Sequence, residues 1–146
     1  MVSVLGVGQM GLVCAGVLAS PEPGMVEGQG LARPVRVRMW GHSADEAGRI
    51  AQTRRTPRLE GFVLPDSIEV TLKDSAALAE SSLIVSAIPV QFIREAWTRL
   101  APHVPPGVGV VSVAKGIETT TSMRPSQVIA DVLRQTGRDD PDGPAR

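Results

Sequence analysis

The chain has 146 residues, a length that fits one globular domain. Hydrophobic residues make up 42% of it and charged residues 21%, which excludes a generally disordered chain. Fifteen basic residues balance fifteen acidic ones and aromatic residues make up only 3%, so we expect no nucleic-acid partner. No apolar run approaches the ~20 residues that a membrane helix needs, so we expect no membrane insertion.

The chain has one cysteine, Cys14, and its amino terminus leads directly into a short apolar run and a glycine motif. A single thiol forms no internal disulfide and no multi-thiolate metal site, which fits a reducing compartment. The start lacks the charged segment and cleavage site of a signal peptide. We therefore expect a cytoplasmic protein, with Cys14 as a small core residue of a helix.

Short apolar runs alternate with helical patterns along the chain, an order typical of βαβ units in a parallel sheet. The sequence therefore predicts an α/β fold with a doubly wound parallel sheet in a single domain. Strands are expected at residues 2–5, 35–40, 68–72, 83–88 and 108–114. Helices are expected from the glycine motif to residue 19 and at residues 43–53, 74–79, 92–100 and 125–135.

Three local patterns give more specific predictions. Residues 83–88 and 108–114 are near-continuous apolar runs, typical of strands buried on both faces. Asp74 is placed to cap a short helix. Helical spacing puts several apolar side chains of the fourth helix on one inward face. These residues are Phe92, Ile93, Ala96, Trp97 and Leu100.

Two segments lack a core pattern. Residues 20–34 form a connection rich in Pro and Gly, which is long for a helix-to-strand link and is expected to be a mobile insertion. Residues 138–146 hold mainly Asp, Pro, Gly and Arg, as in a linker or a cut end. We therefore place one dinucleotide-binding domain at residues 1–137, for the reason that follows.

A Gly6-x-Gly8-x-x-Gly11 motif follows the first expected strand and opens the first expected helix. In this context Gly6 permits a tight turn, Gly8 lets the backbone approach a pyrophosphate, and Gly11 lets helix and strand pack closely. The N–H groups and partial positive charge of the helix N-terminus favour phosphates. The motif predicts a Rossmann-like fold that binds NAD or NADP.

The end of the second strand normally distinguishes these two cofactors. An acidic residue there bonds the ribose 2′-hydroxyl of NAD, and a basic residue can accept the 2′-phosphate of NADP. Here the strand ends in Trp40-Gly41-His42-Ser43, without a carboxylate. Both His42 and Ser43 can hydrogen-bond a ribose or a phosphate, and we favour this role for His42 over the alternative of an exposed loop histidine. The sequence leaves the choice of cofactor open.

Lys115 follows the last expected strand and precedes a glycine. It is one of only two lysines, and Lys73, the other, is expected to be solubilising. Open α/β sheets bind ligands at the carboxyl ends of their strands, where Lys115 is expected. A compact ammonium there could hold a phosphate or polarise a carbonyl, although an isolated lysine is usually a solvated charge. The spacing of the His, Cys, Asp and Glu residues predicts no metal site.

Several strings together resemble the N-terminal half of NAD(P)-dependent glycerol-3-phosphate dehydrogenases, over residues 1 to about 136. The most distinctive is Ala114-Lys115-Gly116-Ile117-Glu118 after an apolar strand. The glycine loop and the turn after the second strand also occur in the same order and at the same spacing as in that family. The other strings are Val4-Leu5-Gly6-Val7-Gly8-Gln9-Met10-Gly11, Arg38-Met39-Trp40-Gly41-His42, Gly61-Phe62-Val63-Leu64-Pro65 and Ala87-Ile88-Pro89.

The resemblance implies an enzyme that interconverts dihydroxyacetone phosphate and sn-glycerol 3-phosphate with NAD(P)H, in glycerophospholipid metabolism. By position, Gln9 and Met10 stand in the loop that touches the cofactor, and His42 stands near the adenosine ribose. Pro89 counts among the cofactor-binding positions. Lys115 stands where the family's lysine meets both cofactor and a phosphorylated small-molecule substrate. A homodimer of the full-length protein is a further expectation.

Some positions depart from the family pattern. Gln9 and Met10 replace a Ser and an aromatic residue, Leu12 replaces a Thr, and Val90 replaces a Ser. The family's Gly-Pro-(Ser/Thr) segment and its all-helical domain, which supplies the general acid/base lysine, are expected beyond Arg146. We therefore expect no catalytic residue within this chain and little activity from it alone.

Two alternatives stay open at this point. The chain could be the N-terminal domain of another hydroxyacid or ketopantoate-type dehydrogenase with the same design. It could also be a non-catalytic nucleotide-binding or scaffolding module that uses the fold without chemistry, because a fold by itself does not fix function.

Overall fold

The computed structural model describes residues 1–19 and 35–137, and the strands of this part lie in one parallel sheet. The strands are β1 (Val2–Leu5), β2 (Val37–Trp40), β3 (Glu69–Thr71), β4 (Leu83–Ser86) and β5 (Gly109–Ser112). The helices are α1 (Gln9–Ala19), α2 (Ala44–Thr53), α3 (Asp74–Leu78), α4 (Val90–Leu100) and α5 (Pro125–Gln135), with a 3-10 turn at Ala101–His103.

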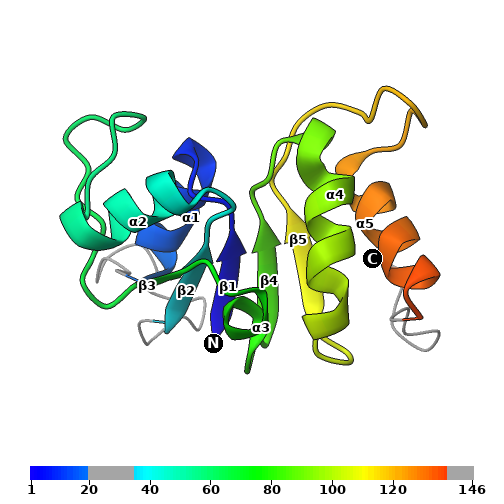
Figure 1. Ribbon diagram of the computed structural model, residues 1–146, viewed down its shortest axis with the longest axis horizontal. Helices are drawn as coiled ribbons and strands as arrows, with labels where there is room; N and C mark the ends of the chain where they lie inside the picture. Colours follow the sequence, from blue (N-terminus) through cyan, green and yellow to red (C-terminus); the bar gives the residue numbers. More distant parts are fainter. Residues whose placement is uncertain (20–34, 138–146) are drawn as a thin grey trace, which may run out of the picture.

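The strand order is β3-β2-β1-β4-β5, which can be followed from left to right in Figure 1. β1 pairs in parallel with β2 on one side and with β4 on the other, so that Leu5 lies opposite both Trp40 and Ser86. The chain therefore winds outward from β1 in one direction and later returns to continue in the other. Parallel sheets of this kind bind ligands beside the carboxyl ends of the strands where the order reverses.

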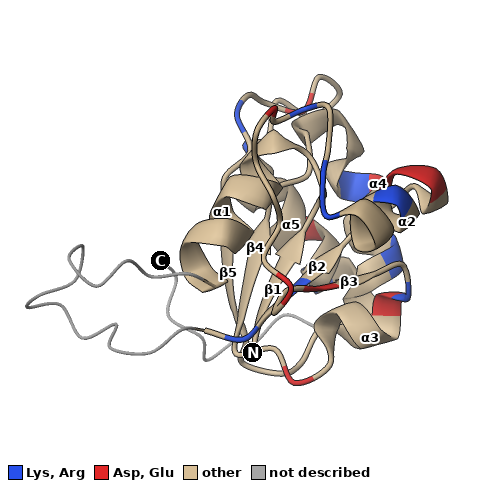
Figure 2. Ribbon diagram, turned by 90° about the vertical axis from the view of Figure 1, so that its left-hand side faces the viewer, with Lys and Arg blue, Asp and Glu red and all other residues tan. Residues whose placement is uncertain are grey.

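Helices cover both faces of the sheet, as a doubly wound fold requires. One buried cluster joins Val4 and Met39 to Leu12 of α1 and Ile50 of α2. A second cluster joins side chains of the opposite face to α3, α4 and α5. Figure 2 shows α1 and α3 on opposite sides of the strands, and the central strands β1 and β4 free of charged residues. The predicted doubly wound α/β fold is confirmed.

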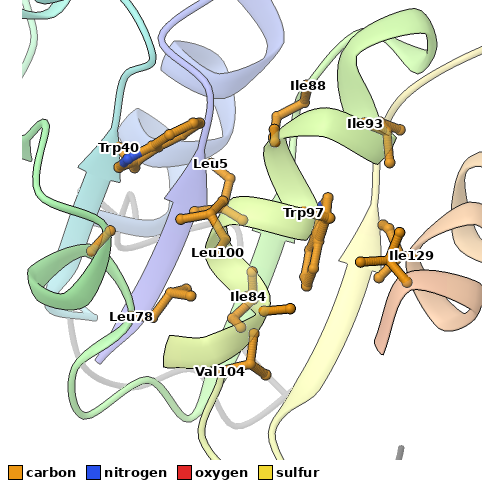
Figure 3. Close-up of a cluster of buried hydrophobic side chains, with 14 of the residues drawn as sticks. Leu5, Trp40, Leu78, Ile84, Ile88, Ile93, Trp97, Leu100, Val104 and Ile129 are labelled. Atoms are coloured by element: carbon orange, nitrogen blue, oxygen red, sulfur yellow. The ribbon is translucent and has the colours of Figure 1, made fainter. Parts of the chain in front are cut away.

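Trp97 of α4 is the centre of the second cluster (Figure 3). Its side chain is fully buried, and its Nε1 donates a hydrogen bond to the Ser86 hydroxyl at 3.1 Å. Ile129 of α5 packs in the same cluster. The helical spacing therefore predicted the inward face of α4 correctly at Ile93, Ala96, Trp97 and Leu100.

Three local predictions were wrong. Phe92 is 55% exposed, because it lies outside the buried face of α4, which consists of Ile93, Ala96, Trp97 and Leu100. Residues 108–114 do not form a strand buried on both faces, because β5 is at the sheet edge and Val111 is 47% exposed. Asp74 does not cap α3, whose N-cap is Lys73. Asp74 instead accepts hydrogen bonds from Trp40 and Arg99.

The predicted mobile insertion at residues 20–34 and the predicted linker at 138–146 lie outside the described residues. The domain boundary at residue 137 therefore stays a prediction. In the part of the chain that the structure describes, no helix is both long and apolar enough to cross a membrane.

Candidate functional site

A cleft of about 660 Å³ opens at the carboxyl edge of the sheet. It is bounded by the loop between β1 and α1, the turn after β2, the turn between β4 and α4, and the segment after β5. Backbone hydrogen bonds continue the sheet up to this edge: Gly6 N–H donates to the Trp40 carbonyl at 2.8 Å, and Ala87 N–H donates to the Leu5 carbonyl at 2.8 Å. The floor of the cleft is thus the rigid end of the sheet at its point of reversal.

The glycines of the first loop have three different reasons to lack a side chain. Gly6 has φ of +116°, and a Cβ there would lie 2.8 Å from the Ala87 carbonyl oxygen. A Cβ on Gly11 would overlap the carbonyl oxygen of Gly6. A Cβ on Gly8 would meet nothing within 4 Å, and Gly8 lines the cleft. Gly6 and Gly11 are therefore needed for packing, whereas Gly8 keeps open the space in front of the loop.

This loop fits the pyrophosphate of a dinucleotide. A phosphate must come close to backbone N–H groups at a helix N-terminus, and a side chain at the middle glycine would occupy that space. The open space at Gly8 lies at the start of α1, where the Leu12 N–H bonds to the Gly8 carbonyl at 3.0 Å. The residues present therefore suit the cofactor that the motif predicts.

The structure brings nearly all of the predicted binding residues together. The predicted residues that line the cleft are Gly6, Gly8, Gln9, Met10, His42, Pro89 and Lys115. Gly11 does not line it, because it is buried behind the loop against Gly6. Lys115 and His42 are exposed and reach the cleft from opposite sides of β1. The individual binding roles of these residues stay predictions.

The cleft also contains residues that the sequence patterns did not reveal. Among them are Glu46 of α2, Arg58 of the following loop, and Phe92, Glu95 and Arg99 of α4. Positions 92, 95 and 99 are spaced three and four residues apart, so one side of α4 faces the cleft. That spacing was visible in the sequence, but only the packing of α4 shows which side meets the cleft.

A cluster of polar and aromatic side chains lies at the end of β2. The Arg99 guanidinium binds the Asp74 carboxylate through Nε at 2.5 Å and through a terminal nitrogen at 2.6 Å. The same carboxylate accepts a hydrogen bond from Trp40 Nε1 at 3.0 Å. The Arg99 hydrogen bonds are the main cause that lowers the pKa of Asp74 below its ordinary value. Asp74 is therefore a carboxylate at neutral pH and fixes Arg99 in place.

A second ionic network holds the segment that carries Lys115. Arg94 of α4 donates to both Glu118 carboxylate oxygens, at 2.9 Å each, and to Asp131 of α5 at 2.7 Å. Glu118 also accepts from the Thr121 hydroxyl, and its backbone bonds with Met123. Glu118, the last residue of the Lys-Gly-Ile-Glu string, thus anchors the loop three residues after Lys115. Glu118 therefore has a structural role in this string, beside the binding role that is predicted for Lys115.

The Arg94 network should make stability depend on pH. Hydrogen bonds from Arg94 are the first cause that lowers the pKa of both Glu118 and Asp131. A carboxyl group with a lowered folded-state pKa stabilises the fold above its ordinary pKa, and this contribution disappears as pH falls through the folded-state value. We therefore expect Arg94→Gln to lower Tm by several degrees at neutral pH, and this difference to shrink below about pH 4.

Thermal unfolding followed by circular dichroism across this pH range measures the effect. Arg134→Gln is the control, because the Arg134 side chain is 62% exposed and its terminal nitrogen lies 3.7 Å from Asp131, so we expect little change. An Arg94→Gln effect of equal size at acidic and neutral pH would contradict the ionic interpretation.

The chain is similar to the N-terminal part of known dehydrogenases over nearly its whole length. The family model of the N-terminus of NAD-dependent glycerol-3-phosphate dehydrogenase matches residues 1–138. The glycerol-3-phosphate dehydrogenase (NAD(P)+) 2 of Mycobacterium tuberculosis is 38% identical over 141 residues, which are 96% of this chain and 38% of that protein. The protein of the same name from Lactobacillus delbrueckii subsp. bulgaricus is 32% identical over 137 residues, 94% of this chain and 37% of that one.

A solved structure gives the same result for the fold. Glycerol-3-phosphate dehydrogenase from Coxiella burnetii superposes with a TM-score of 0.74 at 23% identity, over 90% of this chain and 37% of that chain. The chain therefore spans a little over a third of the length of these relatives. The family match covers the glycine loop, His42 and Lys115, and the resemblance seen in the sequence is confirmed. The chain belongs to the NAD-dependent glycerol-3-phosphate dehydrogenase family, as its N-terminal NAD(P)-binding domain.

Proposed function

We propose that this domain binds NAD(P)H across the cleft, with the pyrophosphate at the Gly6–Gly11 loop, the adenosine ribose toward His42 and the nicotinamide toward Lys115. The observation that carries the proposal is the cleft itself. It lies at the reversal point of the sheet and joins the open space at Gly8 to Lys115. The family match supports the same assignment.

We propose further that the domain serves an enzyme that interconverts dihydroxyacetone phosphate and sn-glycerol 3-phosphate. A bound nicotinamide supplies or accepts the hydride. The residues of this chain hold and orient: the Gly8 backbone admits the pyrophosphate, and the Lys115 ammonium attracts the phosphorylated substrate beside the cofactor. The resemblance to the family implies a general acid/base lysine in a helical domain of the full enzyme, so we infer that this chain contributes binding and positioning.

The two lysines of the chain provide a matched test. Lys115→Ala removes an ammonium that lines the cleft, whereas Lys73→Ala removes an exposed one outside it. Because a hydrogen bond to a charged group contributes roughly 1.5–3 kcal/mol, we expect Lys115→Ala to weaken NADPH binding about tenfold. Lys73→Ala should bind as the parent does, as measured by titration calorimetry. Equal affinities of the two variants would contradict the role of Lys115.

Activity is tested separately from binding. The 146-residue chain, mixed with dihydroxyacetone phosphate and NADH, should show no measurable oxidation of NADH at 340 nm, although it binds the cofactor. Turnover by this chain would contradict the assignment of the general acid to another part of the enzyme. Cytoplasmic location, which the lone Cys14 supports, remains a prediction, as do the homodimer and the lack of a nucleic-acid partner.

A further inference from the structure

We infer that Arg99, assisted by Arg58, makes the adenosine end of the cleft a site for a 2′-phosphate, so that the domain prefers NADPH to NADH. This inference rests on the proposed binding of a dinucleotide in the cleft. In this class of fold, the end of the second strand, here β2, faces the 2′ position of the adenosine ribose. The residues after β2 are Gly41, His42 and Ser43, so no carboxylate there competes with a phosphate.

Arg99 lies at this place although it is far away in the sequence. Its Nε and one terminal nitrogen bind Asp74, and its other terminal nitrogen lies 3.4 Å from His42 Nδ1. Its guanidinium carbon lies 5.2 Å from the centre of the Trp40 ring. Asp74 and Trp40 thus hold the guanidinium, while the remaining terminal nitrogen is at the end of β2. A guanidinium held in this way loses little freedom when it binds a phosphate.

The charged pairs at this end of the cleft present their positive members to solvent. In the Arg99–Asp74 pair the side chains are 43% and 19% exposed, respectively. In the Arg58–Glu46 pair, joined at 2.5 Å, they are 58% and 23% exposed. Both arginines line the cleft. An incoming phosphate therefore meets guanidinium groups, whereas the carboxylates that would accept a ribose hydroxyl are already bonded to arginine.

One group opposes this preference. Glu95 lines the cleft four residues before Arg99, and its charge repels a phosphate. The arginines bind a phosphate by direct charge-assisted hydrogen bonds, whereas the repulsion by an exposed carboxylate is screened by solvent. Attraction of the 2′-phosphate by Arg99 and Arg58 should therefore exceed its repulsion by Glu95. Glu95→Gln should strengthen NADPH binding further.

The experiment compares the two cofactors and their adenosine halves. The parent chain is titrated by calorimetry with NADPH and NADH, and then with 2′,5′-ADP and 5′-AMP, at fixed low salt. We expect the phosphorylated member of each pair to bind about tenfold more tightly, the effect of one charge-assisted hydrogen bond. Arg99→Gln should remove most of this ratio, and Arg58→Gln part of it. Arg134→Gln, an exposed arginine of an ion pair outside the cleft, should keep the ratio of the parent.

The outcomes separate this inference from the proposed function. If the parent binds neither NADPH nor NADH, the proposed function fails and this inference fails with it. If it binds NADH as tightly as NADPH, only the preference for the 2′-phosphate is overturned. An unchanged ratio in Arg99→Gln, with a circular dichroism spectrum like that of the parent, would overturn the role of Arg99. Because Arg58→Gln leaves the Asp74 cluster intact, a lower ratio in that variant supports the inference independently of Arg99.

Discussion

Gly8→Val is expected to weaken the binding of both NADH and NADPH at least about 100-fold, because several charge-assisted hydrogen bonds of roughly 1.5–3 kcal/mol each are lost together. The backbone around Gly8 is where a pyrophosphate must approach the N-terminus of α1. A Cβ there meets nothing within 4 Å, so the branched side chain would occupy open space in the cleft. Fluorescence or calorimetric titration with each cofactor measures the loss.

The folded chain should tolerate Gly8→Val, and this separates a binding defect from a folding defect. We expect its Tm to stay within about 2 °C of the parent, as for surface substitutions that change stability by less than ~0.5 kcal/mol. Gly11→Ala is the contrasting variant, because its Cβ would overlap the Gly6 carbonyl and force the loop to shift. It should lower Tm. Cofactor affinity equal to that of the parent in Gly8→Val would refute the placement of the pyrophosphate.

Trp97→Ala is expected to destabilise the chain by about 3–5 kcal/mol, the range for large aromatic residues removed from a core. Trp97 is fully buried at the centre of the cluster between the sheet, α4 and α5. Its removal leaves a cavity and deprives the buried Ser86 hydroxyl of its hydrogen-bond donor. Since domains of this size have total stabilities of only about 5–15 kcal/mol, a large part of the stability should be lost.

Urea unfolding followed by far-ultraviolet circular dichroism measures the change. Trp97→Phe is the matched control, because it keeps most of the packing and loses the bond to Ser86, at an expected cost of about 1–3 kcal/mol. Met10→Ala, at a position that is 48% exposed, should change stability by less than about 0.5 kcal/mol. A Trp97→Ala effect as small as that of Met10→Ala would contradict the central position of Trp97 in the core.

The local order of the fold could be read from the sequence, because it follows from short-range rules. The alternation of apolar runs and helical patterns predicted the five strands seen at residues 1–19 and 35–137, and the helices that follow them. The Gly6-x-Gly8-x-x-Gly11 spacing predicted the loop between β1 and α1, because the turn, the open space and the close packing each require a glycine at a fixed offset. Lys115 was predicted at the cleft because parallel strands end at a common edge.

The tertiary structure decided what depends on neighbours that are distant in the chain. The exposure of Val111 follows from the edge position of β5, which an apolar run cannot reveal, because the run does not show which strands pair on either side of it. Asp74 fits a helix cap by its sequence, but the stronger partner is the Arg99 guanidinium, 25 residues away.

The positive charge at the proposed adenosine end of the cleft also depends on residues that are distant in the chain. The sequence by itself predicted the α/β class, the glycine loop and the edge of the sheet where the cleft lies, since the motifs and hydrophobic patterns behind these predictions span only a few positions. Only the packing of α4 against the sheet brought Arg99 beside Trp40 and His42, because this contact depends on which side of a helix faces the cleft. The position of Arg99, the residue that we expect to select the cofactor, is therefore set by the tertiary structure.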